Sequence, residues 1–156
     1  MSRRIQKRFV IGLWVFGFAF LAGIAQGRLG YDYRDNLTFY GRPVDVDIDS
    51  NVVTWENNGF ATKVKFSDET RKAQIVSTYS KNWTPEKLQS WIQLQVMTFG
   101  KDGRIGEIRG LEGPDKQTSL QVAFIYDADN KVVGNLSIQQ RVFTKEAIIT
   151  ITDQRK

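Results

Sequence analysis

An uncharged run near the N-terminus, residues 9–27, constrains this chain more than any other feature. The run is 19 residues long, and the basic residues Arg3, Arg4, Lys7 and Arg8 precede it. As a helix with a rise of about 1.5 Å per residue it would extend about 28 Å, close to the hydrocarbon thickness of a bilayer. Four basic residues before the run, against Arg28 alone close behind it, predict that the N-terminus stays in the cytoplasm and that the remaining chain is extracytoplasmic.

Two interpretations of this segment share that topology. Residues 1–8 resemble the basic region of a signal peptide, and small residues from Ala22 to Ala25 favour cleavage near Ala25, which would give a secreted or periplasmic protein. A retained signal-anchor would instead leave a single-pass membrane protein, with residues 9–27 in the lipid bilayer. We favour retention, because the run is long and aromatic-rich and no strong cleavage box follows it.

The excess positive charge of the chain lies in its N-terminal residues. Of 22 basic residues four lie in residues 1–8, and all 17 acidic residues lie beyond residue 27, so the rest of the chain carries 18 basic residues and a net charge of +1. Nucleic-acid-binding domains carry their positive charge as a patch on the folded part. The sequence therefore predicts no nucleic-acid partner, and its length after residue 27 predicts one domain.

Cysteine and histidine are both absent from the sequence. Their absence excludes disulfides, thiolate metal sites and thiol nucleophiles, together with the commonest general base and metal ligand. The composition therefore favours a protein that is not an enzyme and that has no cofactor.

The first part of the domain shows strand periodicity. Residues 28–36 are polar and turn-rich, which predicts a juxtamembrane linker, with the extracytoplasmic domain covering residues 37–156. Apolar and polar residues alternate over residues 44–49 and 60–66, and Asn58-Gly59 is a strong hairpin signal. Residues 43–66 are therefore expected to form a three-stranded meander.

The second part combines one helix with further strands. Residues 73–80 favour a strand, and Thr84-Pro85-Glu86 is a helix start followed by an apolar stripe up to about Met97. Strands are expected over 104–111, 119–126, 132–143 and 147–152, three of them forming an antiparallel meander. The predicted fold class is α+β: a mostly antiparallel β-sheet with one packed α-helix, the other sheet face curled or covered by the N-terminal hairpins, preceded by the N-terminal hydrophobic helix.

One acidic segment has the spacing of a calcium-binding loop. Its candidate metal ligands are Asp45, Asp47, Asp49 and Glu56, at loop positions 1, 3, 5 and 12. Position 6 is Ser50 where such loops need glycine, and no helix flanks the segment. The competing interpretation is the acidic face of a strand opposite Lys63 and Lys65.

Two tryptophans are candidate partner-binding residues. Trp14 belongs to the membrane segment and Trp91 to the apolar stripe of the helix, which leaves Trp55 and Trp83 as surface anchors. Trp83 directly precedes the helix start, where a hydrophobic staple is the alternative.

These observations favour a non-enzymatic, membrane-tethered accessory domain that docks onto a protein partner in a membrane or envelope complex. Two alternatives remain. The first is a cleaved, secreted or periplasmic carrier of an apolar ligand, and the second is a hydrolase that works through carboxylates.

Overall fold

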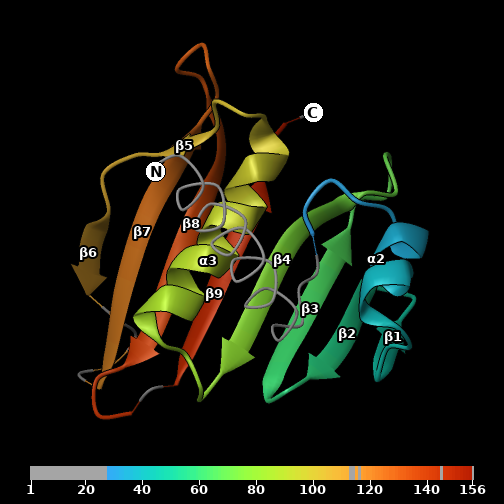
Figure 1. Ribbon diagram of the computed structural model, residues 1–156, viewed down its shortest axis with the longest axis horizontal. Coiled ribbons are helices and arrows are strands. Elements are labelled where there is room, and N and C mark those ends of the chain that lie inside the picture. The colour runs from blue at the N-terminus through green and yellow to red at the C-terminus, as the bar shows by residue number, and fades with distance from the viewer. Residues whose placement is uncertain (1–27, 113–114, 116, 145, 156) are drawn as a thin grey trace, which may run out of the picture.

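The computed structural model describes residues 28–112, 115, 117–144 and 146–155. The N-terminal segment, residues 1–27, lies outside the described residues. Nine strands form a single antiparallel sheet in the order β1-β2-β3-β4-β9-β8-β7-β5, with β6 also paired to β7 (Figure 1). This arrangement confirms the α+β class with a mostly antiparallel sheet.

The four N-terminal strands form successive hairpins. Asn58 and Gly59 both have positive φ, 49° and 78°, as the tight turn between β2 and β3 requires. The meander predicted for residues 43–66 is therefore present, and one further strand extends it. The strands are β1 (Asp45–Asp47), β2 (Val52–Asn57), β3 (Phe60–Phe66) and β4 (Ala73–Ser80).

The C-terminal strands β7, β8 and β9 form the expected meander, and β9 then pairs with β4 to join the two halves into one sheet. The strand predicted over 104–111 is interrupted, because β5 ends at Ile105 and β6 begins at Arg109. The strands are β5 (Arg104–Ile105), β6 (Arg109–Glu112), β7 (Thr118–Tyr126), β8 (Val132–Arg141) and β9 (Ala147–Asp153).

Helix α3 (Pro85–Val96) begins where the sequence predicts it. Thr84 is the N-cap and accepts a hydrogen bond from the Lys87 amide, with Pro85 at the first helical position. A 3-10 turn, η1 (Met97–Phe99), continues the helix to Gly100. The helix packs on the sheet through Trp91, which is fully buried.

A second helix, α2 (Tyr33–Tyr40), begins within the segment predicted to be a linker. Asp32 caps it by accepting a hydrogen bond from the Asp35 amide. Residues 28–32 are also part of the folded domain, because Leu29 is fully buried and Asp32 forms a bridge with Lys72 at the start of β4. The prediction of a linker over 28–36 is therefore corrected: the folded domain includes these residues.

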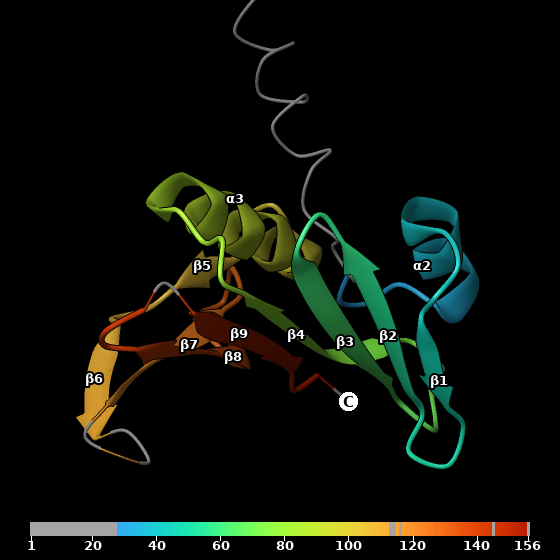
Figure 2. The same ribbon diagram turned by 90° about the horizontal axis from the view of Figure 1, so that it is seen from below.

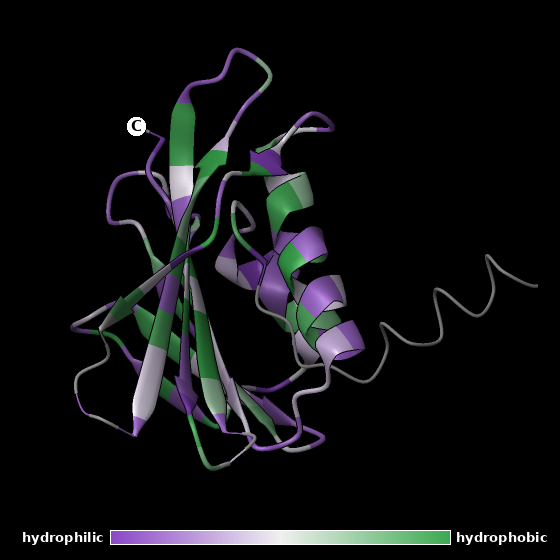
Figure 3. Ribbon diagram, turned by 90° about the vertical axis from the view of Figure 1, so that its left-hand side faces the viewer, coloured by the Kyte–Doolittle hydropathy of each residue, from purple (hydrophilic) through white to green (hydrophobic). Residues whose placement is uncertain are grey.

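Both helices lie on the same side of the sheet (Figure 2). Seen from the β6 side, α3 stands to one side of the strands, and no described helix covers the opposite face (Figure 3). The two ends of the sheet, β6 and the β1–β2 hairpin, bend away from the helices (Figure 2). The second face was expected to be curled or covered by the N-terminal hairpins, and only the second alternative is corrected, because these hairpins extend the same sheet.

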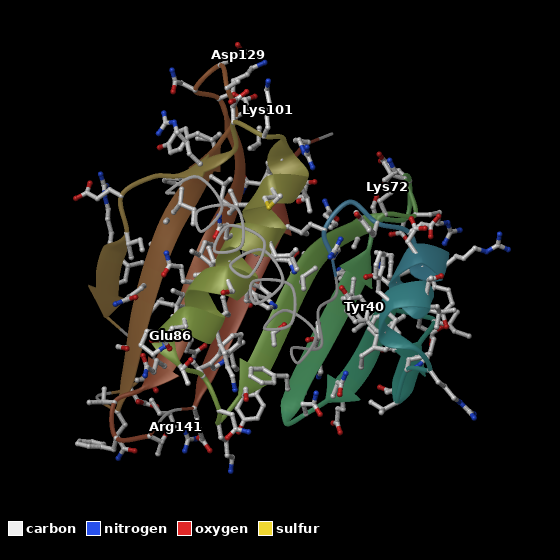
Figure 4. The ribbon with its side chains drawn as sticks, viewed as in Figure 1. Tyr40, Lys72, Glu86, Lys101, Asp129 and Arg141 are labelled. Carbon is white, nitrogen blue, oxygen red and sulfur yellow. The ribbon has the colours of Figure 1, made fainter. Side chains whose placement is uncertain are left out.

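The hydrophobic core fills the space between the sheet and the two helices. Residues at alternate strand positions face this core, including Val64, Val76, Ile151 and Leu136 in one row of paired residues. Three tryptophans complete it: Trp83 stacks edge-on against Trp91, and Trp55 contacts the Tyr33 and Tyr40 rings of α2. Tyr40, labelled in Figure 4, thus links α2 to β2.

Candidate binding surfaces

The four candidate metal ligands lie on the β1–β2 hairpin. Asp45 pairs with Thr54 and Asp47 with Val52, so Glu56 lies two and four residues further along β2. At about 3.3 Å per residue, Glu56 is displaced by about 7 Å from the level of Asp45 and by about 13 Å from that of Asp47. The hairpin therefore spreads these carboxylates along its length.

Asp47 has a structural role in the turn that follows β1. Its carboxylate accepts hydrogen bonds from the amides of Asp49 and Ser50 and from the Ser50 hydroxyl, the last at 2.6 Å. The hydroxyl is the main reason why the pKa of Asp47 is lowered. Within the described residues, no group of three or more Asp, Glu, His or Cys side chains is placed to hold a metal ion.

The competing interpretation of the acidic segment, an acidic strand face opposite Lys63 and Lys65, is close to what the structure shows. Asp45, Thr54 and Lys63 form one row of paired residues across β1, β2 and β3, and Asp47 and Lys65 belong to the next such row. The acids thus lie in line with the lysines, with β2 between them.

Both candidate anchor tryptophans lie in the core. Trp55 is 1% exposed, and its indole donates to the Gly41 carbonyl at 3.1 Å. Trp83 is 8% exposed and donates to the Ala147 carbonyl at 3.2 Å. The expectation that they project from the surface is corrected, because helix α2 covers Trp55 and the start of α3 brings Trp83 against Phe60.

The face of the sheet that carries no described helix is here called the open face. It is a stronger candidate binding surface than the four acidic residues or the two tryptophans. Register fixes which residues lie on it, because strand neighbours alternate between the two faces. On β4, β9, β8, β7 and β6 the open face carries Ile75, Ser77, Tyr79, Ile148, Thr150, Thr152, Asn135, Ser137, Gln139, Arg141, Thr118, Leu120, Val122, Phe124, Arg109 and Leu111. The charged residues in this set are Arg109 on β6 and Arg141, the last residue of β8.

On the open face, strand β7 contributes a column of apolar side chains. Leu120, Val122 and Phe124 point to the open face, while Ala123 and Ile125 are buried on the helix side. A strand that is apolar on both sides is typical of a sheet covered on both faces. In this sheet the described helices cover one face only, and Phe124 remains 55% exposed.

A cleft of about 440 Å³ lies beside this column. Its walls combine aromatic, amide, hydroxyl and charged groups, and they include Phe124, Tyr126, Asn135, Ser137, Arg109 and Glu107. Arg109 and Glu107 form an exposed ion pair at 3.4 Å, and the Arg104 guanidinium lies 5.0 Å from the centre of the Tyr126 ring. The cleft can therefore take an apolar group and hold polar atoms at its rim.

The sequence contained a signal for the open face that the strand prediction did not use. The uninterrupted apolar run Val122-Ala123-Phe124-Ile125-Tyr126 gives β7 apolar residues on both sides. This run contains no tryptophan, and the candidate anchors Trp55 and Trp83 lie on other elements.

A second candidate surface lies around Arg28, the first described residue. The Arg28 guanidinium lies 4.8 Å from the centre of the Phe39 ring and 5.4 Å from that of Tyr31. Burial raises the pKa of the neighbouring Tyr40 well above its usual value, against the opposing effect of the Arg28 charge. Arg28 thus joins the start of the domain to the aromatic residues of α2.

Neither described helix, α2 nor α3, is long and apolar enough to cross a bilayer. Comparison with models of known protein families, with curated proteins and with solved structures finds no match to this chain.

Proposed function

We propose that this protein is a membrane-tethered, non-enzymatic accessory domain that binds a protein partner through the open face of its sheet. The tether is residues 9–27, and the domain lies on the extracytoplasmic side. The observation that carries the proposal is the apolar column of β7, which has the composition of a buried strand yet leaves Phe124 more than half exposed.

The chemistry of the open face favours a protein partner over nucleic acid or anionic lipid. Its central positions are serine, threonine, asparagine and glutamine, flanked by Leu111 and Phe124 on one side and Tyr79 and Ile148 on the other. The centres of protein interfaces are depleted in charge and enriched in aromatic residues. The two charged residues of the set lie at its margins, where Arg109 on β6 is paired with Glu107 and Arg141 at the end of β8 is paired with Glu146.

The partner surface is expected to be apolar and uncharged. An apolar side chain of the partner enters the cleft beside Phe124, while Asn135 and Ser137 supply hydrogen bonds at its wall. Interfaces of this kind depend on a few buried aromatic anchors surrounded by contacts of little energy. Phe124 is therefore the residue whose loss should weaken binding most.

The carrier alternative would use the same cleft, whose volume falls within the range of small-ligand sites. It requires cleavage near Ala25, so the intact mass of the protein isolated from its native membrane separates the two proposals. A retained N-terminus supports the tethered domain, and loss of about 25 residues supports the carrier.

Site-specific crosslinking tests the docking surface. A photoreactive phenylalanine analogue replaces Phe124 in the full chain, and the same analogue replaces Ile48, which is 80% exposed on the β1–β2 turn, as the matched control. In native membranes position 124 is expected to give one adduct of defined mass, and Val122→Asp is expected to abolish it. Equal adducts from positions 48 and 124, or migration of the uncrosslinked protein at its monomer mass in gentle detergent, would contradict the proposal.

A further inference from the structure

The segment that leads into the domain is fixed to three different elements. The Arg28 amide donates to the Asn36 side chain of α2 at 3.0 Å, and the Leu29 amide donates to the Gln95 side chain of α3 at 3.1 Å. The Gly30 amide donates to the Ala73 carbonyl at the start of β4, and the Ala73 amide donates back to the Tyr31 carbonyl. The first described residues therefore have a fixed place between the two helices and β4.

This attachment leaves no spacer between the domain and the uncharged run. Residue 27 ends that run and residue 28 is already bonded to α2, so one Cα step of about 3.8 Å separates them. A domain attached in this way stays within a few ångströms of the point where the tether leaves the bilayer. The orientation of the domain relative to the bilayer therefore depends on which side of the domain carries the attachment.

The attachment of residues 28–31 lies on the side of the domain that carries the helices. Leu29 is bonded to α3, and Arg28 lies against the Phe39 and Tyr31 rings beside α2. Figure 2 shows both helices on the same side of the sheet, with the open face on the other side.

The outward surface of the two helices has a composition suited to lipid headgroups. Charge on α3 is confined to its first turn, where Glu86 is exposed and Lys87 is half-buried. No charged residue occurs from residue 88 to residue 100, and the exposed side chains there are Gln89, Gln93 and, after the helix, Met97, which is 66% exposed. On α2, the exposed residues include Arg34, Asp35 and Thr38 together with Phe39, which is 57% exposed and lies against the Arg28 guanidinium. Aromatic rings beside basic side chains are typical of the interface between a membrane and water.

We propose that this helix face, defined by Phe39, Gln89, Gln93 and Met97, lies against the headgroup layer of the bilayer that holds residues 9–27. The inference rests on the proposed tether. It adds that the direct attachment at residues 28–31 directs the open face away from the membrane, toward a partner.

The absence of native cysteine allows a direct test in the full chain. Single cysteines replace Gln93 on the helix face and, as the matched control, Gln139, an exposed residue on the open face. Each variant is labelled with a small fluorophore and reconstituted into phosphatidylcholine vesicles that carry a headgroup-linked quencher in both leaflets. Equal melting temperatures of the two labelled variants establish that both are folded.

The label at position 93 is expected to be quenched several-fold more than the label at position 139. A flexible insertion of about 20 Gly and Ser residues between residues 27 and 28 is expected to remove most of that difference, because it releases the domain from its fixed orientation. Equal quenching without the insertion, or stronger quenching at position 139, would overturn the inferred orientation while leaving the tether in place. Extraction of the full chain from the vesicles by alkaline carbonate would instead overturn the tether itself.

Discussion

The buried side chain of Gln95 accepts a hydrogen bond from the backbone amide of Leu29, 66 residues earlier in the chain, at 3.1 Å. Both residues are fully buried, so the bond forms where water does not reach it. A polar side chain in the middle of the core-facing surface of α3 thus holds the start of the domain in place. This hydrogen bond is one reason why residues 28–32 are part of the folded domain.

Replacing Gln95 with leucine should destabilise the domain by about 1–3 kcal/mol, because the Leu29 amide would be left buried without its partner. Urea unfolding followed by circular dichroism measures the change. Gln93→Leu is the matched control: it is the same substitution in the same helix at an exposed position, and its effect should stay within about 0.5 kcal/mol. Equal effects of the two substitutions would contradict the role given to Gln95.

The β2–β3 turn depends on a glycine with positive φ. Gly59 has a φ of 78°, and a Cβ at this position would lie 2.7 Å from the side-chain nitrogen of Asn82. Gly59→Ala should therefore lower the unfolding free energy by about 1–2 kcal/mol, chiefly through the left-handed backbone, because the exposed Asn82 side chain can move aside. Gly110→Ala is the control, because a Cβ there meets no atom within 4 Å. A fall in thermal stability of the Gly110 variant as large as that of the Gly59 variant would argue against this explanation.

Local patterns in the sequence predicted the elements that local physics determines. The N-cap at Thr84, the Asn58-Gly59 turn and the strand over 73–80 each depend on neighbouring residues, and all three are present. The pairing of β4 with β9 could not be predicted in this way, because it joins residues more than 60 positions apart and no local pattern encodes it.

Two features were missed although the sequence contained their signals. Helix α2 has an Asp32 cap and apolar or aromatic residues at positions 33, 37 and 40, but the polar composition of residues 28–36 favoured a linker. Helix α2 covers Trp55, so the failure to predict this helix led to the wrong prediction that Trp55 lies on the surface. The open face of β7 was missed because exposure depends on which elements cover a strand.

The burial of the tryptophans can be tested by quenching. In a Trp14→Phe variant the remaining indoles, Trp55, Trp83 and Trp91, are 1%, 8% and 0% exposed, so iodide should quench little of their emission in the folded protein. Unfolding in urea should make all three accessible and shift the emission to longer wavelengths. Adding Phe143→Trp, at a position that is 82% exposed, provides the positive control, because this indole should be quenched in the folded state. Strong quenching without that fourth tryptophan would show that the core described above is open.

The acid dependence of stability is expected to include a contribution from Glu146. Its carboxylate lies 3.1 Å from Lys81 Nζ and 3.6 Å from Arg141 Nε, and the hydrogen bond from Lys81 is the main reason why its pKa lies below the ordinary value of 4.5. Because the folded-state pKa is the lower one, this contribution is fully present above the unfolded-state pKa and is lost as the pH falls through the folded-state value.

Glu146→Gln should therefore show a smaller loss of unfolding free energy than the wild type when urea titrations are compared between pH 6 and pH 3. Lys81→Met removes the main hydrogen-bond donor but keeps the carboxylate, so it should reduce the same acid-dependent loss without abolishing it. The hydrogen bond that Lys81 donates to Glu146 also raises the pKa of Lys81, which adds stability below the unfolded-state pKa of that lysine, and this stability is lost as the pH rises through its folded-state value. Both variants should therefore also lose less stability than the wild type in strongly alkaline solution, and identical pH profiles for all three proteins would show that the ion pair makes no contribution.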